Sequence, residues 1–228
     1  MTAGRPRFTS FFAPKRRGRI AREPALHRLA QWLAILIVAG AACTAIAEDA
    51  KPMFTGPALR DALLRGGFVL YFRHAATDFG QNDDRMSGYE DCAQQRNLTE
   101  AGRKDARAIG DAIRRLHVPV ATVLASPFCR TRETAELIFG RATVDGRVRG
   151  GPARTDDPER YAALRALLST PIPGGANVAI VSHGNPFTAV AGPPYLAEGE
   201  VAVVEPLGGN QFRVVGRIRV DGWSEYMR

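Results

Sequence analysis

The sequence has few of the residues from which metal sites and disulfide frameworks are built. The 228-residue chain contains three cysteines and four histidines, and none of their spacings resembles a zinc-binding pattern. It has no internal repeat, no low-complexity tract and no Gly-x-Ser-x-Gly elbow of the kind that serine hydrolases use. These absences argue against a metal centre, a repeat protein and a serine hydrolase, and we predict neither a metal ion nor another cofactor.

Acidic residues are almost absent from the first 47 residues. This segment has Glu23 as its one acid against eight Lys and Arg residues, whereas the rest of the chain has 23 basic and 22 acidic residues. The positive charge therefore belongs to the N-terminal segment and not to the body. Because the body is nearly neutral and lacks a basic amphipathic helix, neither nucleic acid nor a membrane surface is expected as its partner.

The N-terminal segment has the pattern of an export signal. A basic region precedes an apolar run over residues 33–47, which ends in a small-x-small cleavage pattern at Ala45 and Ala47. The run is shorter than the ~20 residues of a spanning helix. We predict a signal peptide over residues 1–47, cleaved after Ala47, and a single domain over residues 48–228 that is periplasmic or secreted and not inserted in the membrane. An uncleaved N-terminal anchor and a lipid anchor at Cys43 are the alternatives.

Helical and strand patterns alternate along the body. Helices are predicted over residues 58–65, 100–116, 128–139 and 156–168. Strands are predicted over residues 68–72, 118–125, 178–181, 201–204 and 212–220, the last two as a hairpin. This alternation predicts an α/β fold, a three-layer α/β/α sandwich with a mostly parallel central sheet. The intervening residues 74–97 are polar and irregular, and so long a loop in a compact domain is usually functional.

Three predicted strands end in residues suited to anion binding. The first strand leads to Arg73 and His74, the second leads to a helix that carries Arg130, and the third leads to His183. Ligands in α/β sheets bind beyond the carboxyl ends of the strands, so these side chains should meet at one edge. A helix beginning near Phe128 adds partial positive charge there. The predicted site suits a small, doubly charged anion, and guanidinium groups match phosphate oxygens well.

Four motifs then resemble one known family. The stretches are "FRHAATD" (72–78), "LTEAGRKDA" (98–106), "SPFCRTRETAE" (126–136) and "VSHGN" (181–185). In this order they resemble the histidine phosphatase superfamily, to which cofactor-dependent phosphoglycerate mutase belongs. The resemblance implies a phosphoglycerate mutase-like fold with His74 as the nucleophile that becomes phosphohistidine. It also implies that Arg73, Arg130 and His183 bind the phosphoryl oxygens, and that water hydrolyses the intermediate without a metal ion.

The proton donor of the reaction is less clear from the motifs. Members of the family usually have a carboxylic acid that protonates the leaving oxygen. The mutases carry it after the arginine-bearing helix, but residues 141–154 hold only Asp145 and no convincing match. We predict Glu200 for this role. The alternatives are Asp78, Asp83, Asp84 and Glu198.

The two cysteines of the body lie near these motifs. Cys129 precedes Arg130, and Cys92 lies at the end of the long loop that follows His74. In an oxidising compartment they can pair, and otherwise they remain free thiols. We predict a Cys92–Cys129 disulfide that joins the loop to the arginine-bearing helix.

The function predicted from the sequence is that of an exported phosphomonoesterase. Its expected partner is a small phosphorylated metabolite or an envelope sugar phosphate as substrate, and the oligomeric state stays open. Two alternatives are a non-catalytic module that binds phosphate or sugar phosphate, and a protein-phosphohistidine phosphatase. A mutase is disfavoured because its acid-bearing segment is not recognisable.

Overall fold

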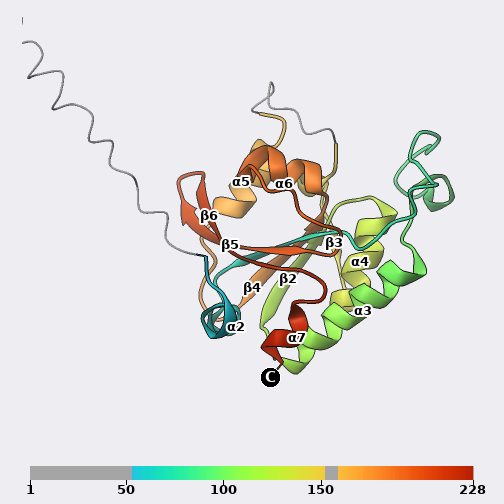
Figure 1. Ribbon diagram of the computed structural model, residues 1–228. Helices are drawn as coiled ribbons and strands as arrows, with labels where there is room; N and C mark the ends of the chain where they lie inside the picture. Colours follow the sequence, from blue (N-terminus) through green and yellow to red (C-terminus); the bar gives the residue numbers. More distant parts are fainter. Residues whose placement is uncertain (1–52, 152–158, 228) are drawn as a thin grey trace, which may run out of the picture. The chain divides into compact units, whose positions relative to one another are not determined.

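The computed structural model describes residues 53–151 and 159–227, in which one six-stranded sheet has helices on both faces (Figure 1). The strands are β1 (Val69–Arg73), β2 (Val120–Ala125), β3 (Thr143–Val144), β4 (Asn177–Ser182), β5 (Val201–Gly208) and β6 (Gln211–Ile218). Their order in the sheet is β3-β2-β4-β1-β5-β6. The first four strands in the chain run parallel to one another, whereas β5 and β6 are antiparallel to their neighbours. The α/β class and the mostly parallel sheet are thus confirmed.

The helices form the two outer layers. They are α2 (Gly56–Arg65), α3 (Glu100–Arg115), α4 (Cys129–Phe139), α5 (Ala162–Ser169), α6 (Gly184–Ala191) and α7 (Trp223–Tyr226). Helices α5 and α6 cover one face of the sheet, and the other four lie against the opposite face (Figure 1). Strand β1 lies in the middle, with Leu70 and Phe72 in one core and Val69 and Tyr71 in the other. Burial on both faces explains why β1 is a continuous apolar run.

Local signals explain how α3 and α4 come together beside the sheet. Thr99 caps α3, since its hydroxyl oxygen accepts a hydrogen bond of 2.9 Å from the Gly102 backbone N–H. The two helices approach closely at Gly110, where a Cβ atom would lie 2.5 Å from the Ile138 carbonyl oxygen. Glycine is therefore needed where α3 packs against the C-terminal part of α4.

Several element boundaries differ from those predicted. Strand β5 continues to Gly208, because the turn that follows takes only Gly209 and Asn210, both with positive φ, and the strands pair up to it. Strand β3 and helices α6 and α7 were not predicted. Helix α6 begins at Gly184 and carries Pro186 in its first turn, where proline is tolerated.

Two predictions fall on parts of the chain that the structure does not describe. The signal peptide predicted over residues 1–47 and the start of the helix predicted at residue 156 both lie outside the described residues. Among residues 53–151 and 159–227, no helix is both long enough and apolar enough to cross a membrane.

Candidate active site

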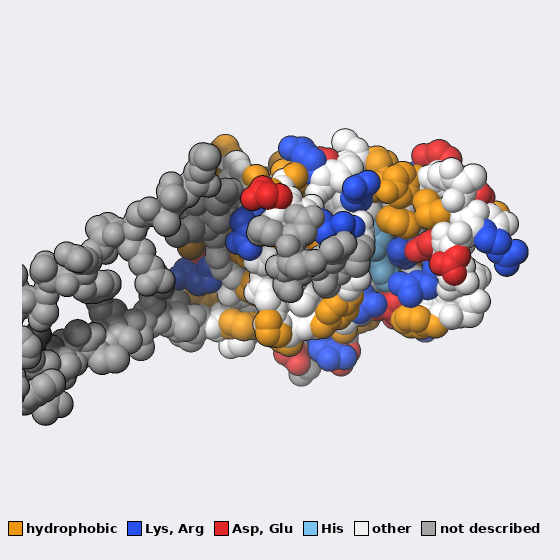
Figure 2. All heavy atoms as spheres, turned by 90° about the horizontal axis from the view of Figure 1, so that it is seen from above, with side chains coloured by type: hydrophobic (Ala, Val, Ile, Leu, Met, Phe, Trp, Pro, Cys, Tyr) orange, Lys and Arg blue, Asp and Glu red, His pale blue; other side chains and the backbone are white. Residues whose placement is uncertain are grey.

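The predicted convergence of strand ends is present in the structure. Arg73 lies opposite Ser182 in the β1–β4 register. The backbone N–H of His74 donates to the Ser182 carbonyl oxygen at 2.9 Å, so the pairing with β4 continues one residue beyond the end of β1. Together with Arg130 and His183, Arg73 and His74 line one cavity of about 400 Å³. On this face of the molecule histidine atoms are visible among Lys and Arg side chains (Figure 2).

His74 is held as a neutral imidazole with one nitrogen free. Its side chain is 2% exposed, and Nδ1 lies 2.9 Å from the Ala75 carbonyl oxygen. Nδ1 therefore carries the proton and donates it, which leaves the lone pair on Nε2. Burial lowers the pKa of His74 to about 3, opposed by the Ala75 hydrogen bond and reinforced by the charges of Arg130 and Arg73. The imidazole is neutral near pH 7 and can act as a nucleophile.

His183 is the second imidazole of the cavity. It precedes α6, and its Nε2 lies 2.8 Å from the Ser126 hydroxyl oxygen. Its ring centroid is 5.5 Å from that of His74. Burial, followed by the neighbouring His74 and Arg130, lowers the pKa of His183 well below its usual value. Gly150 packs against this ring, since a Cβ atom there would lie 2.7 Å from Cδ2.

Each of the two predicted arginines is oriented by a carboxylate. Nη2 of Arg73 lies 3.4 Å from Glu198 Oε1, and its Nη1 donates to a backbone carbonyl oxygen at 2.8 Å. Nη1 of Arg130 donates to Asp83 Oδ1 at 2.9 Å, and the Arg130 side chain stacks over Phe128 with Cζ 4.4 Å from the ring centroid. Burial lowers the pKa of Arg130, and the bond to Asp83 opposes this effect. The N–H groups that remain can bind an incoming anion.

The candidate acids in the long loop differ in position. Asp83 and Asp84 both line the cavity. Asp83 is bound to Arg130 and also accepts from the Arg96 backbone N–H at 2.9 Å. The carboxylate of Asp84 accepts no hydrogen bond from the described residues. Asp78 is exposed, and it accepts from the Gly80 backbone N–H at 2.8 Å.

The two candidate glutamates face other groups. Glu198 accepts from the Thr77 hydroxyl at 2.7 Å and lies 3.9 Å from Nδ1 of His74, the nitrogen that does not face the substrate in our interpretation. Glu200 pairs with Arg217 at 3.1 Å, and its other oxygen accepts from a backbone N–H at 2.7 Å. The structure thus does not bring Glu200 among the residues that line the cavity.

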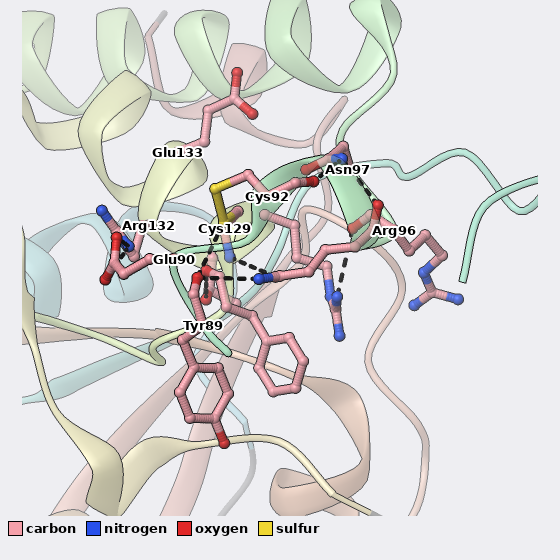
Figure 3. The surroundings of a disulfide bond; sticks show 12 residues. Tyr89, Glu90, Cys92, Arg96, Asn97, Cys129, Arg132 and Glu133 are labelled. Atoms are coloured by element: carbon pink, nitrogen blue, oxygen red, sulfur yellow. Dashed lines mark hydrogen bonds and ion pairs between the residues drawn. A yellow bond between two sulfur atoms is a disulfide. The ribbon is translucent and has the colours of Figure 1, made fainter. Parts of the chain in front are cut away.

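The predicted disulfide is present. It joins Cys92 to Cys129, with the two Cα atoms 5.7 Å apart, and so connects the long loop to the first residue of α4 (Figure 3). Other residues of the cavity were not predicted as site residues, among them Arg96, Gly150 and Tyr195. Arg96 lies just before the "LTEAGRKDA" motif and near Cys92 in the sequence. This position is the sequence feature that could have identified it as a site residue.

Within the described part of the chain, no group of three or more His, Cys, Asp or Glu side chains is arranged to hold a metal ion. The cavity instead brings three arginines and two neutral imidazoles together with Asp83 and Asp84, and the cationic groups suit an anionic ligand. No curated protein matches the sequence significantly.

Comparison with solved structures returns several phosphatases at low identity. The protein histidine phosphatase SixA in complex with tungstate is 20% identical, with a TM-score of 0.49 over 68% of this chain and 97% of that chain. Bacillus stearothermophilus YhfR is 24% identical, with a TM-score of 0.43 over 64% and 94%. A mycobacterial glucosyl-3-phosphoglycerate phosphatase is 19% identical, with a TM-score of 0.47 over 65% and 97%.

The family comparison agrees with the motifs. The model that describes the histidine phosphatase superfamily (branch 1) matches residues 69–151, which include β1, the long loop, α3 and α4. The matched segment contains His74, Arg73 and Arg130, and the fold brings His183 beside them. Residues 69–151 thus match the model of branch 1 of the histidine phosphatase superfamily, the family that the four motifs resemble.

Proposed function

We propose that the protein is an exported phosphomonoesterase that acts through a phosphohistidine on a small phosphorylated metabolite or an envelope sugar phosphate. The main support is the buried, neutral His74, whose Nε2 has no hydrogen-bond partner among the described residues and which shares a cavity with two arginines and His183. Export is supported by the disulfide, because such bonds persist in oxidising compartments, and by the predicted signal peptide.

The geometry suits a two-step phosphoryl transfer. Nε2 of His74 attacks phosphorus, and the bond from phosphorus to the leaving oxygen breaks. Arg73, Arg130 and His183 bind the equatorial oxygens, where the negative charge is distributed in the transition state. Water then attacks the phosphohistidine and releases phosphate, which restores the neutral imidazole.

The leaving oxygen needs a proton, and the positions of the carboxylates favour Asp84 over Glu200. Asp83 is less suited because its carboxylate already accepts hydrogen bonds from Arg130 and from the Arg96 backbone N–H. Asp84 lies on the wall of the cavity without such bonds. We assign Asp84 to this role.

The rest of the cavity can hold a small polar leaving group. Its volume of about 400 Å³ exceeds what a phosphoryl group alone fills and is at the low end for ligand pockets. Gln81 and Asn82 line one wall with amide groups, and Tyr195 and Phe128 add aromatic rings. Amide and aromatic side chains together suit the hydroxyl groups and the apolar face of a sugar.

The first experiment is hydrolysis of p-nitrophenyl phosphate by residues 48–228, beside the His74→Ala variant, with EDTA present from pH 5 to pH 8. We expect turnover that survives EDTA and disappears in the variant, because no other side chain can replace the nucleophile. Turnover that persists in His74→Ala, or that EDTA removes, would contradict the proposal. Phosphate binding without turnover on any monoester would favour a binding module.

A further inference from the structure

Arg96 supplies the cavity with a positive charge that has no counter-ion among the described residues. Arg73 and Arg130 each contact a carboxylate, at 3.4 Å and 2.9 Å. The guanidinium of Arg96 has no ion pair and no hydrogen-bond acceptor within residues 53–151 and 159–227, and its Nε is buried. It lies over the ring of Phe79, with Cζ 4.9 Å from the centroid. A partly desolvated guanidinium with free donors is well suited to bind an anion that enters the cavity.

The backbone of Arg96 contacts two residues that line the cavity, Asp83 and Arg130. Its N–H donates to Asp83 Oδ1 at 2.9 Å, and its carbonyl oxygen lies 3.4 Å from Nη1 of Arg130. Arg96 lines the same cavity as His74 and His183, and its charge contributes to the lowered pKa values of both rings.

The disulfide holds the turn that carries Arg96. On one side Gln95 is 1% exposed, and its Oε1 accepts from the Cys129 backbone N–H at 3.0 Å. On the other side the amide of Asn97 donates to the carbonyl oxygens of Cys92 and Gln95, both at 2.8 Å (Figure 3). Both neighbours of Arg96 are thus connected to the disulfide or to α4, and the backbone direction at Arg96 is fixed.

We propose that Arg96 is a further phosphate-binding residue and that the Cys92–Cys129 disulfide positions it in the cavity. This inference rests on the proposed function only in placing the phosphoryl group beside His74. The two cysteines are 37 residues apart in the chain, and the segment between them includes α3 and β2. Without the bond, the end of the long loop that carries Arg96 is no longer joined covalently to α4, and we expect it to gain conformations in which Arg96 leaves the site.

Binding of inorganic phosphate, measured by isothermal titration calorimetry, tests the role of Arg96 without requiring turnover. Arg96→Gln should raise the Kd roughly 10- to 100-fold, the usual effect of losing a charged hydrogen bond. The Kd of Arg96→Lys should lie between those of the wild type and of Arg96→Gln, because lysine keeps the charge but lacks the planar guanidinium group. Arg132→Gln is the matched control: Arg132 lies beside the disulfide but pairs with Glu90 at 2.9 Å outside the cavity, and its Kd should not change.

The positioning role predicts that the effects of the disulfide and of Arg96 are not additive. Dithiothreitol transfers two electrons and two protons to the bond, which gives two cysteine thiols while the reagent closes to a cyclic disulfide. Reduction should weaken phosphate binding in the wild-type protein and change it little in Arg96→Gln. Asn97→Ala gives the same test with the disulfide intact, and circular dichroism verifies that each protein is folded.

The outcomes separate the inference from the proposed function. A wild-type Kd in Arg96→Gln would overturn the role of Arg96, and additive losses would overturn its positioning by the disulfide. A protein that binds phosphate through Arg96 but hydrolyses no monoester would keep the inference and reject the hydrolase. A protein that binds no phosphate would reject both.

Discussion

Acid should destabilise the folded protein through its buried histidines, and His74 allows the size of the effect to be calculated. Its pKa is about 3 in the folded protein against a usual value of 6.5 in the unfolded chain. Between these two pKa values the unfolded chain binds a proton at His74 that the folded protein does not bind. The contribution of His74 to stability is therefore complete above pH 6.5 and is lost progressively as the pH falls towards 3. Each pKa unit corresponds to about 1.36 kcal/mol, and the change from pH 7 to pH 4.5 removes about 2.5 kcal/mol. His183 acts in the same direction.

Urea unfolding of the wild-type protein and of His74→Gln at the two pH values measures this effect. Carboxylates that lose ion pairs in acid are common to both proteins, so their contribution cancels in the comparison. The wild-type protein should lose about 2.5 kcal/mol more than the variant between pH 7 and pH 4.5. His117→Asn is the control: His117 is exposed and has a φ of 56°, which asparagine tolerates, and this variant should follow the wild type. Equal pH dependence in the wild type and His74→Gln would show that His74 is not held neutral by burial.

Three further changes test the catalytic assignment and the scaffold. Asp84→Asn should lower kcat for p-nitrophenyl phosphate by roughly 100-fold, whereas Glu200→Gln should leave it near the wild-type value; the reverse result would return the acid to Glu200. Asn177→Ala should lower the free energy of unfolding in urea by about 2–4 kcal/mol, because the buried Asn177 amide donates to two backbone carbonyl oxygens at 2.8 and 2.9 Å. An unfolding free energy equal to that of the wild type within experimental error would contradict this. Gly110→Ala should cost about 1–3 kcal/mol through its 2.5 Å clash with α4, whereas Gly146→Ala, with no atom within 4 Å, should be neutral in the same assay.

The convergence of four site residues could be predicted because it follows from the direction of the strands. Parallel strands place their carboxyl ends at one edge, so Arg73, His74 and His183 needed only correct strand assignments. Arg130 needed only the helix that begins after the second strand. Each of these positions depends on a regular element and its immediate continuation.

The position of the acid could not be derived in the same way. The direction of the Glu200 side chain depends on Arg217, which β6 brings alongside from a later part of the sequence. Arg96 lies in an irregular loop whose path depends on its bonds to Asp83 and on the disulfide. Such tertiary contacts leave no periodic pattern in the sequence, and the same reason explains why the short strand β3 was missed.

The two-sided hydrogen bonding of His74 has a consequence for how such an enzyme can change its substrate. Its backbone N–H donates to the Ser182 carbonyl oxygen and its carbonyl oxygen accepts from the Gly199 N–H, both at 2.9 Å, so the proposed nucleophile is anchored to the chain segments on either side. The walls of the cavity come from separate connections, and replacing them by those of a relative would leave His74 in place. One wall, however, is covalently joined to α4. Loop 75–97 can therefore be exchanged only together with position 129, since otherwise Cys92 or Cys129 is left as an unpaired thiol.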